Sequence, residues 1–337
     1  MDKIRVTAQL GAAIVHEDGS VFAPDGQYAY VSAQRFIKSV CDGDCCFICL
    51  ASPHEKTFNN EHVLPNWILR RQRLHNKTIN LMDGTRHRYG TYTIPCCLEC
   101  NTRLGRLFEG AMSKTFAALF EPAAMNRPDS LTNLSKMFQW LALIFIKVHL
   151  KDRKLFATGT APLDWAELHH VYCIARAAAC GVEVNPEVMG SIWLFNVPQF
   201  DEEEFFDYAD VTYAKTMMLR VGSCCCIVVF DDGCAVVNSR AVPSFAWSEE
   251  AASLQLREVT EIAAYGNLLL SERPTFHTAW NPQSGRFSIE RRVPANPPNF
   301  GPTDSAVFRK IRELLFAEVL DPAVAQEFLA GGRTFLT

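Results

Sequence analysis

The stretch Cys97-Leu-Glu-Cys100-Asn101 repeats the spacing of an earlier stretch, Cys46-Phe-Ile-Cys49. Two such CxxC units are the usual source of four thiolates for one tetrahedral zinc ion, because each tight turn points two sulfur atoms at the same place. We therefore predict one structural zinc site made by these four cysteines. The separation between the two units is longer than in a simple zinc ribbon and leaves room for an inserted structure.

The cysteine content favours a metal site over disulfides. The chain has 13 cysteines, an odd number, and its N-terminus carries acidic residues and no sustained apolar run typical of an export signal. Thiols stay reduced inside cells, where paired CxxC units favour metal binding. Cys45 and Cys96 lie next to the two units, so an alternative ligand set exists one residue away. The CxxC spacing favours the four cysteines named above.

Between the two units lies Glu61-His62-Val-Leu-Pro65. Between two CxxC units, this pattern resembles the motif of a metal-dependent nuclease. Phosphodiester cleavage of that kind needs a base that deprotonates water and a cation that stabilises the charge on the phosphate and the leaving oxygen. Histidine has a pKa suited to the base, and carboxylate and amide oxygens are hard ligands suited to Mg²⁺ or Mn²⁺. Adjacent strand residues point to opposite faces. We therefore expect an irregular turn or bulge that brings Glu61 and His62 to one phosphate.

The ordered combination of CxxC, EHxxP and CxxCN resembles the cysteine-containing branch of the HNH, or ββα-metal, nucleases. The resemblance covers about residues 44–108. It implies a β-hairpin followed by a helix around one divalent ion, with a separate zinc on the four cysteines. It also implies that His62 is the general base and that Glu61 and Asn101 hold the catalytic Mg²⁺ or Mn²⁺.

One position departs from this family pattern. The middle Asn, which in the family lies shortly before the second CxxC unit, is absent. Tyr92 and Thr93 occupy that region, and Asn80 lies earlier in the chain. In the family this Asn braces the loop that carries the base, so its absence bears on the orientation of His62.

The positive charge of the chain is concentrated in the same segment. The formal net charge is −4, yet residues 66–108 contain eight basic and two acidic residues, a local charge of +6. Phosphate binding depends on the local density of Lys and Arg, so this segment is suited to a nucleic acid. Arg103 and Arg106 follow Asn101 and either bind phosphates near the ion or lie on a solvated helix face. The basic residues are Arg70, Arg71, Arg73, Lys77, Arg86, Arg88, Arg103 and Arg106.

The composition, with 48% hydrophobic and 21% charged residues over 337 positions, is that of a globular protein with more than one domain. We predict an α+β fold, a ββα-metal nuclease module with structural zinc joined to a larger mixed α+β C-terminal domain. The predicted segments are residues 1–40 with short strands, 41–120 with the nuclease module, and 121–337, with a boundary near residues 121–130.

The hydrophobic pattern predicts further elements outside the cysteine-rich segment. Apolar residues at spacings of three and four predict a core helix from about Leu131 to Asp152. A hairpin is predicted from Cys225–Phe230 and Cys234–Asn238 around the turn Asp231–Gly233. The other predicted elements are strands at Ser191–Val197 and Thr212–Val221 and helices at Glu249–Leu270 and Asp304–Val319.

These patterns predict a Mg²⁺- or Mn²⁺-dependent endonuclease that acts on DNA, most directly on the double-stranded form. The C-terminal domain would supply target selection, homodimerisation or binding of a regulatory partner, an arrangement that resembles restriction enzymes and phage-defence effectors. The alternatives are a zinc-stabilised nucleic-acid-binding module without catalysis and a thiol-redox or metal-sensing protein. The most apolar run, Phe138–Ile146, is shorter than the roughly 20 residues needed to span a bilayer. We therefore expect no membrane contact and a cytoplasmic location.

Overall fold

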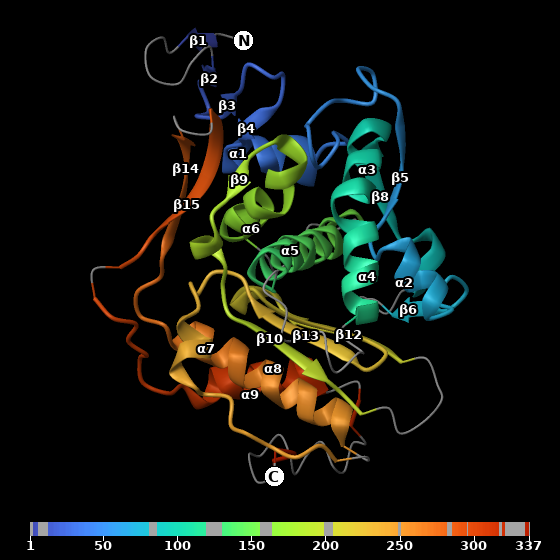
Figure 1. Ribbon diagram of the computed structural model, residues 1–337, viewed down its shortest axis with the longest axis vertical. Helices are drawn as coiled ribbons and strands as arrows, with labels where there is room; N and C mark the ends of the chain where they lie inside the picture. Colours follow the sequence, from blue (N-terminus) through green and yellow to red (C-terminus); the bar gives the residue numbers. More distant parts are fainter. Residues whose placement is uncertain are drawn as a thin grey trace. The chain divides into compact units, whose positions relative to one another are not determined.

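The chain is represented by a computed structural model that describes residues 3–5, 13–80, 86–118, 130–155, 164–198, 205–248, 251–281, 285–294, 296–316, 319–320 and 334–336. The described elements are mixed α and β, as predicted (Figure 1). They fall into two units. The first comprises the described parts of Met1–Ala117, Asn126–Val188 and Phe276–Arg291, and the second those of Ala118–Met125, Met189–Thr275 and Arg292–Thr337. The predicted boundary near residues 121–130 lies almost wholly outside the described residues.

Short strands open the first unit, as the sequence predicts. The sheet has the order β1-β2-β3-β4, and its turns at Gly19 and Gly26 require the left-handed backbone that glycine adopts without strain (φ 81° and 83°). Residues 33–40, which lie within the predicted short-strand segment, are instead helical. The helix begins where Ser32 Oγ accepts a hydrogen bond from the N–H of Arg35 at 3.1 Å. The elements are β1 (Lys3–Arg5), β2 (Ile14–His16), β3 (Val21–Phe22), β4 (Tyr28–Tyr30) and α1 (Ala33–Phe36), followed by a π-helical turn (Ile37–Cys41).

Two strands and a helix form the centre of the cysteine-rich segment. β5 (Phe58–His62) pairs antiparallel with β8 (Thr93–Cys97), and α3 (Leu98–Leu104) begins at the residue after β8. α3 then continues through a π-helical turn into α4. The remaining elements of this segment are α2 (Asn66–Arg71), β6 (Thr78–Asn80), β7 (Arg86–Arg88), the π-helical turn (Gly105–Glu109) and α4 (Gly110–Ala118).

The predicted core helix is α5 (Ser130–Leu155), and its middle is buried almost without interruption from Met137 to Leu150. It packs against α6 (Trp165–Ala177), which Asp164 caps through the N–H of Ala166 at 2.9 Å. No helix in the described part of the chain is long and apolar enough to cross a bilayer. The first unit also contains β9 (Glu183–Val184) and all but one end residue each of β14 (Thr275–Asn281) and β15 (Arg286–Arg292). These strands form a sheet of order β14-β15-β9.

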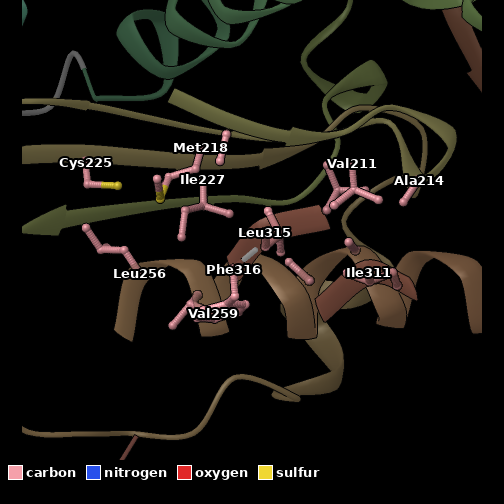
Figure 2. Packing of buried hydrophobic residues seen from close by; sticks show 14 of the residues in the cluster. Val211, Ala214, Met218, Cys225, Ile227, Leu256, Val259, Ile311, Leu315 and Phe316 are labelled. Carbon is pink, nitrogen blue, oxygen red and sulfur yellow. The ribbon is translucent and has the colours of Figure 1, made fainter. Parts of the chain in front are cut away.

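The second unit is an antiparallel sheet of order β10-β13-β12-β11 with two helices on one face. Figure 2 shows Met218 and Ile227 of the sheet directed towards Leu256 and Leu315 of the helices, where burial of apolar surface stabilises the unit. The elements are β10 (Ile192–Asn196), β11 (Phe206–Val211), β12 (Thr216–Val221), β13 (Cys224–Val229), α7 (Ala235–Ser239), α8 (Ala252–Leu269) and α9 (Ser305–Phe316).

The predicted hairpin between Cys225–Phe230 and Cys234–Asn238 is wrong. β13 pairs instead with the preceding strand β12, and the later segment forms α7. The cause is Asp232, whose carboxylate accepts hydrogen bonds from the N–H groups of Val236 (2.8 Å) and Ser191 (2.7 Å). The bond from Val236 gives a partner to a backbone N–H in the first turn of α7, which the helix itself leaves unpaired. The segment after Asp232 therefore forms a helix and does not pair with β13.

A buried ion pair links the two helices of the second unit. Arg312 Nε lies 2.6 Å from Glu261 Oε1, whereas Glu261 Oε2 is buried and has no hydrogen-bond partner among the described residues. Burial raises the pKa of Glu261 to about 7, although Arg312 opposes the shift. A carboxyl whose pKa is higher in the folded than in the unfolded state stabilises the fold at low pH, and this contribution is lost as the pH rises through the folded pKa.

We therefore predict that Glu261→Gln removes a fall in the free energy of unfolding that wild type shows from about pH 4.5 to about pH 7. Urea unfolding at both pH values measures the difference. Glu313→Gln, which changes an exposed carboxyl next to Arg312 on α9, should keep the wild-type dependence. An unchanged pH dependence in Glu261→Gln would contradict this assignment.

Candidate functional site

The four predicted cysteines meet at one place. Cys46, Cys49, Cys97 and Cys100 bring their sulfur atoms within 4.8 Å of one another, which confirms the predicted cluster. Cys49 Sγ and Cys97 Sγ are 3.7 Å apart. Tetrahedral zinc with Zn–S bonds of about 2.3 Å separates its sulfur ligands by about 3.8 Å. The donor set and its spacing are therefore compatible with a structural zinc.

Local backbone geometry builds each half of this cluster. Cys46 and Cys49 lie in a tight knuckle in which the N–H of Leu50 donates to Cys46 O at 2.9 Å and Leu50 has a φ of 63°. Cys97 ends β8, and Cys100 lies in the first turn of α3. The cluster therefore joins the knuckle to the point where the strand becomes the helix.

The distances among all four sulfur atoms favour Cys97 over Cys96 as the ligand at the second unit. Cys96 Sγ lies 3.8 Å from Cys46 Sγ, but Cys96 is not in the group whose sulfur atoms all lie within 4.8 Å of one another. Cys97 belongs to that group. Hydrogen bonds from Cys100, Cys49 and Cys96 hold the pKa of Cys46 well below its usual range. The thiolate, which is the metal-binding form, is thus favoured there.

The strand β5 presents different chemistry on its two faces. It pairs with β8 without a bulge, with Glu61 opposite Ile94 and His62 opposite Thr93. Asn59 and Glu61 therefore share one face, and His62 is on the other. The irregular turn or bulge expected at Glu61 and His62 is absent, and regular pairing separates their side chains.

We call the face of β5 that carries Asn59 and Glu61 the inner face, and the face that carries His62 the outer face. The inner face holds a buried ion pair that the sequence did not reveal. Glu61 is 7% exposed, and its Oε1 accepts a hydrogen bond from Lys147 Nζ of α5 at 2.8 Å. The same ammonium donates to the carbonyl oxygen of His62 at 2.8 Å. Burial raises the pKa of nearby Glu109, while Lys147 opposes the shift and Glu61 adds to it. Glu61 is therefore not an open carboxylate.

Asn101 faces the same side of the hairpin. Its Nδ2 donates to Asn59 Oδ1 at 3.0 Å. This bond fixes the orientation of the amide, so the Oδ1 atom of Asn101 is the one turned away from Asn59. Asn101 and Glu61 are thus linked through alternate residues of one strand face.

His62 lies beside a second histidine on the outer face. The rings of His62 and His75 are 6.1 Å apart between centroids and meet edge to face. Partial burial lowers the pKa of His62, with His75 and Lys147 adding to the shift and Glu61 opposing it. His75 is positioned by Gly90, whose N–H donates to His75 O at 3.2 Å. A Cβ at Gly90 would come within 2.8 Å of that oxygen, so only glycine fits.

Six of the eight predicted nucleic-acid-binding residues form what we call the basic arm, the part of the module between β5 and β8. All six side chains are exposed, as is Arg106 beyond the arm. Arg103 differs, because its guanidinium is half-buried and donates to the carbonyl oxygen of Ala179. The arm residues are Arg70, Arg71, Arg73, Lys77, Arg86 and Arg88.

Sequence reasoning missed three residues of this site. They are Lys147, Asn59 and His75, none of which the motifs of the sequence single out. The available signals were the charge of Lys147 inside an apolar helix pattern and the i, i+2 spacing of Asn59 and Glu61.

No family model, curated protein or solved structure matches the chain.

We predict that Cys49→Ser abolishes zinc retention and exposes the module to proteolysis, because a structural zinc contributes folding free energy directly. Elemental analysis should fall from about one zinc per chain to none. Cys45→Ser is the matched control and should keep the zinc, because Cys45 is outside the cluster. Loss of zinc in the Cys45 variant instead would move the ligand set by one residue.

Proposed function

We propose that the cysteine-rich segment is a zinc-stabilised nuclease module of the HNH type that hydrolyses phosphodiester bonds in DNA. The observation that supports this best is the four-cysteine cluster at the junction of β8 and α3. It lies directly before Asn101 and beside the strand that carries Glu61 and His62. Two antiparallel strands followed by a helix is also the order that the family resemblance implies.

In this proposal His62 accepts a proton from the water that attacks phosphorus, and the phosphorus–oxygen bond to the leaving sugar breaks. His62 is half-exposed and is the last residue of β5, so a substrate on the outer face can reach it. A bound Mg²⁺ or Mn²⁺ would stabilise the negative charge on the phosphate and on the leaving oxygen.

Glu61 and Asn101 would hold that divalent ion. They offer a carboxylate and an amide oxygen, the hard donors that Mg²⁺ prefers. The hydrogen bond from Asn101 Nδ2 to Asn59 leaves Asn101 Oδ1 as the ligand atom, which is how an outer contact orients a metal ligand. The type of donor fits, and in the structure Glu61 Oε1 accepts a hydrogen bond from Lys147 Nζ.

Main-chain contacts at Tyr92 fit the absence of the family's middle Asn. The carbonyl oxygen of Tyr92 accepts the N–H of Val63 at 3.0 Å, directly after His62. The Tyr92 side chain is buried, and its hydroxyl hydrogen-bonds Asp152 of α5. A backbone brace can therefore hold the base-bearing segment without an Asn side chain.

A binding module without catalysis is the second candidate. It is favoured by the regular β5–β8 pairing, which directs Glu61 and His62 to opposite faces. Such a module would use the cysteine cluster for folding and the exposed basic arm for phosphate contacts. The two candidates differ in whether His62 is needed for strand cleavage.

We predict that His62→Ala retains the fold and the zinc but nicks plasmid DNA on the order of 10²-fold more slowly, as expected for loss of a general base. The assay removes loosely bound metal with a chelator and then adds Mg²⁺ or Mn²⁺. His54→Ala, which changes an exposed histidine of the same segment, should cut like wild type. Equal cutting by His62→Ala would exclude His62 as the base. No cutting by folded wild type or by a folded Lys147→Met variant, which lacks the ammonium bound to Glu61, would favour the binding module.

We also predict that Arg70→Glu/Arg71→Glu weakens DNA binding and flattens its dependence on salt, because fewer counterions are released from the phosphates. Fluorescence anisotropy at several salt concentrations measures the slope. Lys38→Glu/Lys136→Glu makes the same charge change at exposed positions outside the basic arm and should retain the wild-type slope. The same slope in both double variants would remove the arm from the DNA interface.

A further inference from the structure

Lys147 is a charged residue inside an apolar helix. It is 1% exposed, within the buried stretch of α5 that runs from Met137 to Leu150. Burying an ammonium group is costly unless an opposite charge and hydrogen bonds compensate it. The partners of Lys147 therefore explain its position.

The ammonium group binds the Glu61-His62 dipeptide through two atoms. Nζ is 2.8 Å from Glu61 Oε1 and 2.8 Å from the carbonyl oxygen of His62. A separation of 2.8 Å is typical of a charge-assisted hydrogen bond to a carboxylate. The positive charge beside Glu61 is therefore supplied by a side chain of α5.

A second carboxyl group lies within electrostatic reach of the same ammonium. Glu109, in the π-helical turn after α3, interacts with both Lys147 and Glu61. Lys147 therefore offsets the negative charge of Glu61, to which it is hydrogen-bonded, and it also opposes the rise that burial causes in the pKa of Glu109. The negative charge of Glu61 favours a cation beside it. An ammonium group and a divalent ion on the same carboxylate would repel each other strongly at a separation of about 4 Å.

We propose that Lys147 occupies the Glu61 carboxylate in place of a divalent cation, so that Mg²⁺ or Mn²⁺ binds there only when Lys147 is withdrawn. This inference rests on the proposed function only for the assignment of Glu61 as a metal ligand. The lysine is then an autoinhibitory contact that keeps the module free of catalytic metal. Its helix, α5, sets the metal affinity of β5.

The test is a Mn²⁺ titration in which electron paramagnetic resonance measures the concentration of the free ion. Lys147→Met should bind Mn²⁺ at least about tenfold more tightly than wild type, because the competing charge is gone. Lys151→Met removes the same charge one turn later on α5, where Nζ lies 6.0 Å from the centre of the Tyr92 ring, and should bind like wild type. Unchanged or weaker binding by Lys147→Met overturns the proposal.

Thermal unfolding covers the case in which loss of Lys147 weakens the fold. Mn²⁺ should raise the melting temperature of Lys147→Met, since a ligand that binds only the native state stabilises it. It should not raise that of Lys147→Met/Glu61→Gln, which lacks the carboxylate. A Lys147→Met protein that stays unfolded or unstabilised with Mn²⁺, or a gain that persists without Glu61, overturns the proposal. Neither measurement uses DNA cleavage. The nicking assay, run on Lys147→Met as well as on wild type, tests the nuclease proposal separately.

Discussion

The convergence of four thiols at the end of β8 is the constraint on which the rest of the site depends. Cys97 and Cys100 fix how α3 leaves the strand, and this direction brings Asn101 to the inner face of β5. The other half of the cluster is held from α6, where buried Arg176 donates to Ile48 O at 3.0 Å within the knuckle. A metal on the cluster would therefore tie the strand, the helix and the knuckle at one point.

Regular pairing of β5 with β8 places the candidate site residues on two opposite faces of β5. Glu61 and Asn101 belong to the inner side, where Lys147 supplies positive charge. His62 and His75 belong to the outer side, in the part of the chain that carries the basic arm. The two sides meet only at the end of β5, because His62 is the last strand residue. Any joint action of Glu61 and His62 must take place at this edge.

The sequence allowed prediction of those features that depend on spacing along the chain. The cysteine cluster, the helices α5, α8 and α9 and the short N-terminal strands follow from local patterns. Features that depend on distant contacts were not predictable in this way. Asp232 starts a helix because Ser191, far away in sequence, shares its carboxylate. Lys147 reaches Glu61 across 86 positions, and no periodicity encodes that contact.

The ion pair between Lys147 and Glu61 is difficult to explain by stability alone. Well-packed apolar residues usually stabilise such a buried position as well as an ion pair does, because desolvating two charges offsets most of their attraction. An apolar pair would hold α5 against β5 without placing a carboxylate beside His62. The charged pair instead places a carboxyl group at the strand end and covers it with the Lys147 ammonium. That combination is useful where a carboxylate has to be retained for chemistry and protected from cations until it is needed.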